Sequence, residues 1–466
     1  MKKRILYLVL CLIFVTSLFA ACSTKSSDVS KDSTSSVETS NKSISKSETK
    51  DFSGRTLEVM LDKGGGGSFY EPIIKRLQEL YPGLKVNYWY DLNGNEVFRT
   101  RVLANNAPDI FNLNQGLFSY YSAIEEGLCL PLNDILELPT MDNTQKLKDI
   151  IDLNLMKQKG YIDGKYYMFP DLLFTAGLWY DAKLLRDNNI KVPTTWDEFM
   201  DAAAKLKGKG IYAIGYCGTM AHEYPLSYWF YPMVCSVDYE TYVGIQNCDP
   251  SAWKSEGMKE VVRRMEELRD KGYYDASTVA LGNSETQMQF IARKFAFLPC
   301  GSWLEAEMGD AWPDDFELTY LPFSGKKDSS GSDYVLTSSL ASSVSSTTKN
   351  IDIVGEFYRV FFSDKTAIEG QIKVHQNGMA IKGFGENYGH LLNKSTEQVW
   401  KAIDQGVKGF ASLANTWYPE YPKQAGNAIN ALMTGSINGD EFMDRMEALF
   451  QSIKDDPNIV KYKFGS

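Results

Sequence analysis

The sequence predicts an α/β fold built around two separate cores. Strand-like and helix-like segments alternate from residue 56 onward, and this alternation indicates a mostly parallel sheet flanked by helices. After a polar N-terminal stretch about 415 residues remain, which is more than one core of ordinary size holds. The alternation and the length together predict two α/β lobes.

The N-terminus predicts export to the cell surface. Residues 2–4 are basic, and residues 5–19 form an apolar run that is shorter than a comfortable membrane span. Two alanines then precede Cys22, and this site resembles a bacterial lipobox, in which the cysteine is lipidated and becomes the mature N-terminus. Phe19 stands where that pattern usually has leucine. The alternative is an ordinary cleaved signal peptide with a chance cysteine.

The segment after Cys22 predicts a flexible tether. Residues 23–50 consist mostly of Ser, Thr, Lys and acidic residues, so they cannot bury enough apolar surface to offset the entropy cost of ordering. We therefore expect residues 1–21 to be a signal peptide and residues 22–52 to be a lipid-anchored leash on the outer face of the bacterial cell membrane.

The first elements after the tether follow from local signals. A helix is expected with Pro72 in its first turn, and it ends at Pro82 and Gly83. A second helix is expected at residues 97–104. Strands are predicted at residues 56–61, 84–90 and 110–111.

Further along the chain, a hairpin is predicted with its turn at Asp163 and Gly164, and it leads into an extended segment at residues 174–180. A helix starts after Thr195 as N-cap, with Glu198 in the reciprocal capping position. A strand at residues 294–298 is expected to break at Pro299. Further helices are predicted at residues 249–271, 351–362, 397–401, 424–433 and 440–453.

Charge and cysteine content exclude several classes of partner. The chain has 49 Lys and Arg against 59 Asp and Glu, a formal net charge of −10 that argues against nucleic acid and anionic lipid as partners. The five cysteines after Cys22 match no zinc spacing, and both free thiols and one bridge among Cys217, Cys235 and Cys248 remain open. With three scattered histidines, we expect no metal and no cofactor.

Four stretches resemble the family 1 extracellular solute-binding proteins of carbohydrate ABC importers. They are residues 80–90 (LYPGLKVNYWY), 107–114 (APDIFNLN) with 125–134 (EEGLCLPLND), 166–199, and 295–308 (FAFLPCGSWLEAEM). The last of these is similar to members associated with N-acetylglucosamine and chito-oligosaccharides.

The resemblance implies a two-lobed, periplasmic-binding-protein-like fold in which hinge strands join two α/β lobes. On this sequence the implied first lobe holds residues 53–168 and 332–381, and the implied second lobe holds residues 169–331 and 382–466. The implied crossings fall near residues 169–177, 321–324 and 381.

The implied function is that of a receptor and not of an enzyme. Such a protein binds a mono- or oligosaccharide in the cleft between its lobes and delivers it to the permease subunits of an ABC transporter. We expect a monomer without a cofactor.

Candidate ligand contacts follow from what a sugar presents. Its flat C–H face needs an aromatic plane, which Trp and Tyr supply at low conformational cost. Trp303 follows the predicted strand break, and an aromatic run around residues 224–231 is too dense for one helix face. Packing in the core is the alternative interpretation of each ring. The aromatic candidates are Phe174, Trp229, Tyr231, Trp303, Trp417 and Tyr421.

Sugar hydroxyls need polar partners, and several candidates lie in predicted loops or crossings. Ligands of parallel sheets bind at the carboxyl ends of the strands. Asn114 and Gln115 follow the third predicted strand, and the glycine-rich loop at residues 64–67, whose backbone could approach a ligand closely, follows the first. The resemblance also points to polar residues that lie beside the implied crossings and after the strand predicted at residues 294–298. The polar candidates are Asn114, Gln115, Asp171, Glu305 and His375.

Two rival functions remain open. A secreted glycoside hydrolase needs two carboxylates, and Asp171 with Glu305 is the pair the sequence offers. A lipid-anchored sugar sensor of the same fold is the other rival. Serine hydrolase chemistry is disfavoured, because the S-x-x-K match at residues 346–349 lacks its companion motifs.

Overall fold

The computed structural model describes residues 50–62, 70–91, 94–113, 120–157, 159–418 and 420–464. The proposed lipidation residue Cys22, the glycine-rich loop at residues 64–67 and the candidates Asn114 and Gln115 lie outside the described residues. No helix in the described ranges combines the length and the apolar character that crossing a membrane requires.

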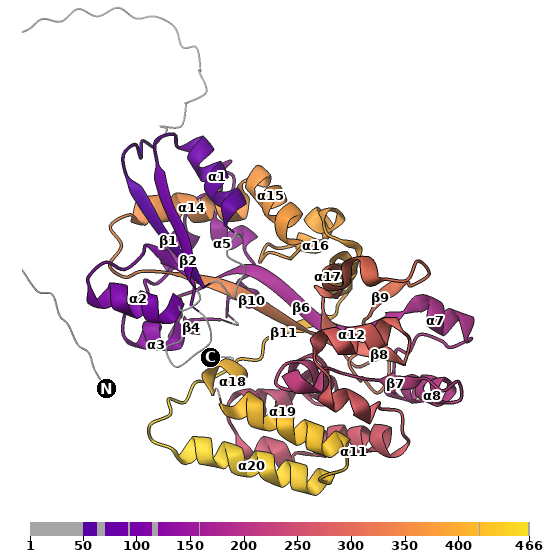
Figure 1. Ribbon diagram of the computed structural model, residues 1–466. Helices are drawn as coiled ribbons and strands as arrows, with labels where there is room; N and C mark the ends of the chain where they lie inside the picture. Colours follow the sequence, from indigo (N-terminus) through magenta and orange to yellow (C-terminus); the bar gives the residue numbers. More distant parts are fainter. Residues whose placement is uncertain are drawn as a thin grey trace, which may run out of the picture. The chain divides into compact units, whose positions relative to one another are not determined.

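A mixed nine-stranded sheet runs through the described part of the chain, with the strand order β2-β1-β3-β10-β6-β8-β7 (Figure 1). Strand β9 pairs with β6, β11 pairs with β10, and β4 and β5 form a separate hairpin. The bounds are β1 Thr56–Asp62, β2 Lys85–Asp91, β3 Ile110–Phe111, β4 Tyr161–Ile162, β5 Lys165–Tyr166, β6 Phe169–Asp181, β7 Tyr212–Ile214, β8 Phe295–Gly301, β9 Leu318–Leu321, β10 Tyr334–Val344 and β11 Lys408–Phe410.

Helices connect these strands. The α-helices are α1 Glu71–Leu80, α2 Gly94–Leu103, α3 Tyr120–Glu125, α4 Asn133–Leu136, α5 Leu147–Ile150, α6 Leu153–Lys157, α7 Ala182–Asp187, α8 Trp196–Lys207, α9 Tyr231–Val237, α10 Tyr239–Gln246, α11 Glu256–Asp270, α12 Asn283–Ile291, α13 Leu304–Met308, α14 Ile351–Ser363, α15 Lys365–His375, α16 Phe384–Tyr388, α17 Lys394–Asp404, α18 Ala414–Trp417, α19 Glu420–Met433 and α20 Gly439–Asp455. A π-helical turn, η3 (Leu226–Phe230), precedes α9, and a 3₁₀ helix, η4 (Pro250–Lys254), precedes α11.

The sheet is parallel where the sequence alternates strand and helix, and mostly antiparallel along its two long strands, β6 and β10. The β1–β2, β1–β3, β7–β8 and β10–β11 pairs are parallel. Strand β6 pairs antiparallel with β8, β9 and β10, and β10 pairs antiparallel with β3. Parallel neighbours need a crossover connection, usually a helix, and the sequence shows clear signals for such helices.

Two large hydrophobic clusters form the interior. The first core gathers side chains of β1, α1, α14 and α15, and the second core gathers side chains of β8, α8, α9, α11, α19 and α20. Figure 1 shows β6 and β10 between the two corresponding groups of helices.

Strand β6 contributes to both cores in sequence order. Phe169, Leu172 and Leu173 pack in the first core, whereas Ala176 and Leu178 pack in the second. Strand β6 therefore runs from the first core into the second.

The chain crosses between the two cores twice more, and both of these crossings lie later in the sequence than the implied ones. Leu321 and Phe323 both pack in the second core, and the return to the first core occurs within β10, because Leu336 packs in the second core and Val344 in the first. Phe384 still packs in the first core, and the last passage lies in α17 and not near residue 381. The exact limits of the lobes stay a prediction.

Most predicted elements are present, with two local corrections. Thr195 caps α8 as predicted, accepting a hydrogen bond from the Glu198 N–H (3.4 Å), but the Glu198 carboxylate accepts from the N–H of Thr194 and not of Thr195. The helix predicted from residue 249 is two elements, because Ser255 is extended and caps α11 after η4.

The predicted strand break at Pro299 is wrong. Strand β8 continues to Gly301, and Pro299 lies opposite Leu178 of β6. On its other side, β8 pairs with β7 only at Phe295 and Phe297. Position 299 is therefore locally an edge, where the missing N–H of proline costs no ladder hydrogen bond.

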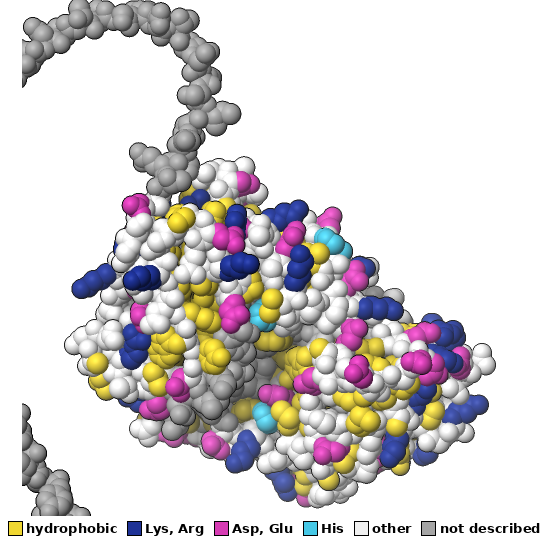
Figure 2. All heavy atoms as spheres, turned by 45° about the horizontal axis from the view of Figure 1, so that its top comes forward, with side chains coloured by type: hydrophobic (Ala, Val, Ile, Leu, Met, Phe, Trp, Pro, Cys, Tyr) yellow, Lys and Arg dark blue, Asp and Glu magenta, His cyan; other side chains and the backbone are white. Residues whose placement is uncertain are grey.

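All five cysteines in the described residues are buried free thiols, so the disulfide left open by the sequence is absent among them. On the face displayed in Figure 2, acidic and basic side chains are interspersed, and neither sign dominates.

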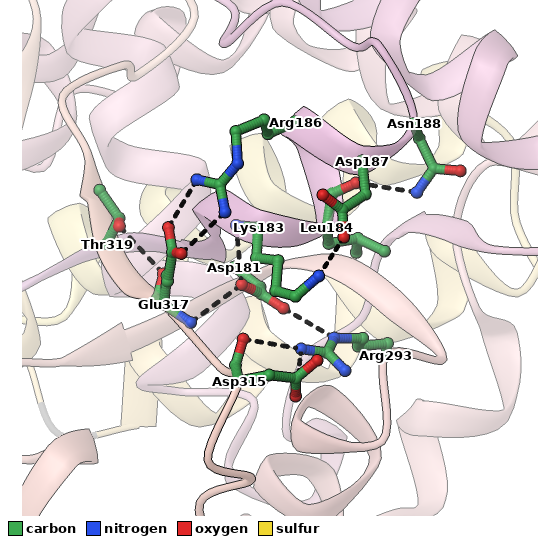
Figure 3. A network of polar contacts seen from close by, with 10 residues as sticks. All are labelled: Asp181, Lys183, Leu184, Arg186, Asp187, Asn188, Arg293, Asp315, Glu317 and Thr319. Carbon is green, nitrogen blue, oxygen red and sulfur yellow. Dashed lines mark hydrogen bonds and ion pairs between the residues drawn. The ribbon is translucent and has the colours of Figure 1, made fainter.

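The far end of β6 is anchored by a polar network (Figure 3). The Asp181 carboxylate accepts hydrogen bonds from the N–H groups of Lys183 and Glu317 (3.0 Å each) and pairs with Arg293 at 2.7 Å. Arg293 also contacts Asp315, and Arg186 binds Glu317 in a bidentate pair. A single buried carboxylate thus ties β6 to α7 and to the segment before β9.

A second buried carboxylate, Asp171, lies in the first half of β6. It accepts hydrogen bonds from the hydroxyls of Tyr70 (2.6 Å) and Ser342 (2.8 Å), and Ser342 contacts Tyr358 of α14. The side chain has no solvent exposure, and burial raises the pKa of Asp171 to about 8. This placement makes Asp171 a structural link between β6, β10 and the first core.

We predict that Asp171 makes the protein less stable as the pH rises. Because its folded pKa lies above its ordinary value, the folded state binds the proton more tightly, and stability falls between about pH 4 and pH 8 by at most ~1.4 kcal/mol per pH unit. Chemical denaturation of the wild type and Asp171→Asn across this range measures the slope. An equal slope in both proteins would contradict the prediction.

Candidate functional site

The two long strands are buried except at one place. Every residue of β6 is buried apart from Phe174, which is half-buried. In β10 only Ser338 is exposed and only Leu340 is half-buried, and Ser338 lies directly opposite Phe174 in the register. The strands that join the two cores therefore open to solvent at a single window.

A cavity of about 580 Å³ lies over this window. Its walls come from β6, β10, the segment before η3, the end of β8, and the segment around α18. The lining residues are Lys159, Phe174, Thr175, Ala176, His222, Glu223, Ser227, Tyr228, Trp303, Leu336, Thr337, Ser338, Leu340, Ala411, Ser412, Leu413, Asn415, Thr416 and Pro422.

Three aromatic rings from separate segments meet in this cavity. The Trp303 indole lies edge to face with the ring of Phe174 (6.3 Å between centroids) and with the ring of Tyr228 (5.9 Å). Such edge-to-face contacts hold the rings in defined orientations. The cavity thus offers rigid apolar planes beside polar side chains.

The position of Trp303 depends on the glycine two residues before it. A Cβ added to Gly301 would lie 2.1 Å from the Trp303 ring, so only glycine allows the indole to fold back against the end of β8. Backbone pairing between Ser302 N–H and the Thr175 carbonyl (2.9 Å) fixes this turn to β6.

Tyr228 is placed by the π-helical turn η3. All three rings of this dense run, Tyr228, Trp229 and Phe230, are buried in the second core, but the wider turn lets Tyr228 also line the cavity. The sequence flagged the density of this run but could not say which ring would face the cavity.

A smaller chamber of about 280 Å³ adjoins the first. It is lined in part by Asn112, Tyr120, Tyr121 and Met168. The two chambers share seven lining residues, Lys159, Phe174, Glu223, Ser338, Leu340, Leu413 and Thr416. They are therefore two parts of one site.

The C-terminal segment supports the wall of the smaller chamber. The Tyr462 hydroxyl donates to Glu125 of α3 (2.8 Å), and its ring stacks on Trp417 (5.2 Å) and lies 4.9 Å from Tyr121. Trp417 packs in the second core, so these contacts bridge α3 to the other half of the site.

Two of the predicted ligand contacts line the site, Phe174 and Trp303. Trp229, Tyr231 and Tyr421 are instead buried in the second core. Tyr231 is hydrogen-bonded to Tyr421 and donates to Asn415 (3.1 Å), a residue that lines the cavity. These rings therefore pack behind the residues that form the cavity wall.

The remaining described candidates also lie outside the lining. Asp171 is buried in β6 and accepts hydrogen bonds from Tyr70 and Ser342, as described above. The Glu305 carboxylate accepts from the Ser395 N–H (2.9 Å) and so ties α13 to α17. His375 is the last residue of α15, and Trp417 packs between Tyr121 and Tyr462.

Sequence reasoning missed Lys159, Glu223 and Ser338. Ser338 had a usable signal, since it is a polar residue in an otherwise buried strand. Lys159 and Glu223 are in irregular segments, where a charged residue is the ordinary expectation.

Among the residues that the structure describes, the site shows neither a metal-binding group nor a carboxylate pair. Among the described residues no cluster of His, Cys, Asp and Glu could hold a metal ion. Glu223 is the one carboxylate among the described residues that line either chamber. A glycosidase of the usual kind needs two, so this geometry disfavours the hydrolase alternative.

Comparison with known proteins identifies the family. Residues 62–368 match the family described as bacterial extracellular solute-binding protein. The chain belongs to this family. Its members are receptors and not enzymes.

Relatives extend the match over most of the chain. The diacetylchitobiose-binding protein NgcE of Streptomyces coelicolor is 23% identical over 426 residues, which cover 88% of this chain and 87% of that protein. The multiple sugar-binding protein of Streptococcus mutans is 23% identical over 406 residues, which cover 86% of this chain and 91% of that protein.

The fold has a counterpart among solved structures. The ligand-free structure of RafE from Streptococcus pneumoniae matches with a TM-score of 0.67 at 20% sequence identity, over 86% of this chain and 98% of that chain. This match confirms the predicted fold class, the mixed α/β fold of solute-binding proteins.

We predict that Gly301→Ala displaces the Trp303 ring without unfolding the protein. The added methyl group collides with the indole, whereas Gly389→Ala, a matched control, meets only an ordinary 3.8 Å contact. Comparing tryptophan fluorescence spectra and melting temperatures measures both effects. A wild-type spectrum in Gly301→Ala would contradict this account of the ring position.

Proposed function

We propose that the protein is an extracellular receptor that binds an oligosaccharide in the two-chamber site and delivers it to the permease of an ABC importer. The observation that carries the proposal is the window in β6 and β10, where Phe174, Tyr228 and Trp303 bring three rings to one cavity. Rigid rings pack against the C–H faces of sugars, and the surrounding hydroxyl and amide side chains supply hydrogen bonds.

The size of the site favours more than one sugar ring. The larger chamber lies within the range of about 300–1,000 Å³ that is typical of small-molecule sites, and the smaller chamber extends it. The relatives named for diacetylchitobiose and for multiple sugars support a di- or oligosaccharide ligand. Among these we propose N-acetylated chito-oligosaccharides, because the segment at residues 295–308 resembles members with that preference.

Hinge closure is the proposed mechanism. The two cores are joined by β6, β10 and α17, and the site lies where β6 and β10 are exposed. A ligand that contacts both sides stabilises the closed form, which then docks on the permease. Scattering that gives an unchanged radius of gyration with saturating ligand would argue against closure.

Attachment through a lipid on Cys22 is a separate proposal, supported by the lipobox-like site and the polar segment after it. We predict that the wild type incorporates labelled palmitate in the producing cell and that Cys22→Ser does not. Equal labelling of both proteins would remove Cys22 as the attachment point.

The ligand proposal predicts a specific loss in Trp303→Ala. A thermal-shift screen of mono- and oligosaccharides identifies the ligand, and calorimetry then compares the variants. We expect Trp303→Ala to weaken binding at least tenfold, or about 1.4 kcal/mol, because the central ring of the cavity is removed.

Trp312→Ala serves as the control, since its indole contacts Phe316 away from the cavity lining. Wild-type affinity in Trp303→Ala would exclude the cavity as the ligand site. Release of shorter sugars during prolonged incubation would favour a hydrolase instead.

A further inference from the structure

Two charged side chains of opposite sign lie at the junction of the chambers. Lys159 and Glu223 each line both the larger and the smaller chamber. Lys159 follows α6, which packs on the first core, and Glu223 precedes η3, which belongs to the second core. Among the described residues that line either chamber, no other side chain belongs to Asp, Glu, Lys or Arg.

The Lys159 ammonium is held in place but only partly used. It donates one hydrogen bond to the backbone carbonyl of Ser339 in β10. An ammonium group has three donors, so two remain for a ligand. None of the ion pairs among the described residues involves Lys159, although the buried Asp171 carboxyl lies near enough to favour the charged ammonium and raise its pKa. Burial lowers the pKa of Lys159 to about 8, which leaves the charged form in excess at neutral pH.

The Glu223 carboxylate is likewise incompletely satisfied. The Tyr228 hydroxyl donates to it at 3.3 Å, and the His222 Nε2 lies 3.9 Å away. A carboxylate accepts about four hydrogen bonds, so Glu223, which lines both chambers, can accept further ones. Its side chain is 42% exposed.

From this arrangement we propose that Lys159 and Glu223 select uncharged saccharides. The proposal rests on the proposed function and deepens it. A neutral sugar unit at the junction accepts hydrogen bonds from the ammonium through its hydroxyl or acyl oxygens, and its hydroxyls donate to the carboxylate. The pair has no net charge, so a ligand with an amino or a carboxylate group gains from one partner and is repelled by the other.

Removing one member of the pair makes the site charged and changes the preference. Lys159→Met leaves the negative Glu223, which favours cationic sugars and disfavours anionic ones. Glu223→Gln leaves the positive Lys159 and has the opposite effect.

The test is calorimetry with three probes, a neutral N-acetylated chitobiose, its deacetylated cationic form and an anionic digalacturonate. We expect the wild type to bind the neutral probe at least tenfold more tightly than the charged ones. Lys159→Met should raise the ratio of cationic to neutral affinity at least tenfold, and Glu223→Gln should do the same for the anionic probe. Lys157→Met and Glu126→Gln, which alter neighbouring side chains outside the lining, should keep the wild-type ratios.

Each outcome decides between the two proposals. If the wild type binds the neutral probe and both variants keep its ratios, the selection by charge is overturned and the receptor function stands. If the wild type binds no uncharged saccharide in the wider screen, the proposed function fails and the selection fails with it. Should Lys159→Met not fold, Lys159→Gln, which keeps a donor near Ser339, provides the same comparison.

Discussion

The antiparallel pairing of β6 with β10 is the constraint on which the rest of the structure depends. These strands pass from one core to the other, and their ladder runs from Phe169 to Ala176 on β6. Both are buried on nearly every residue, so they are held by packing at each end. Ser338 is exposed and its partner Phe174 is only half-buried against the first core, and the proposed ligand site lies over this pair.

Polar side chains reinforce the same two strands. Asp171 links β6 to Ser342 of β10 and to Tyr70, and Asp181 anchors the far end of β6 to α7. Buried charges without partners are costly, and these carboxylates have several donors each. These hydrogen bonds lie on either side of Phe174 along β6, so they fix the strand before and after the cavity.

The site itself combines contributions that are distant in the sequence. Phe174, Tyr228 and Trp303 come from three segments, and Lys159 and Glu223 come from opposite sides of the junction. Residues that the sequence suggested as contacts, such as Tyr231 and Tyr421, pack one layer behind and hold Asn415 in the wall. Aromatic content thus indicated a sugar site, but it did not distinguish the layer that faces the ligand from the layer that supports it.

The sequence by itself determined the local elements, since the periodicity of apolar residues, the Thr195 cap and the Asp163–Gly164 turn act over a few residues. It also indicated the family, and it suggested Trp303 and Phe174, which line the cavity. Only the tertiary structure decided that β8 continues past Pro299, that η3 presents Tyr228, and that Lys159 and Glu223 line the same two chambers. The physical reason is that burial and pairing depend on partners far along the chain, which local patterns do not specify.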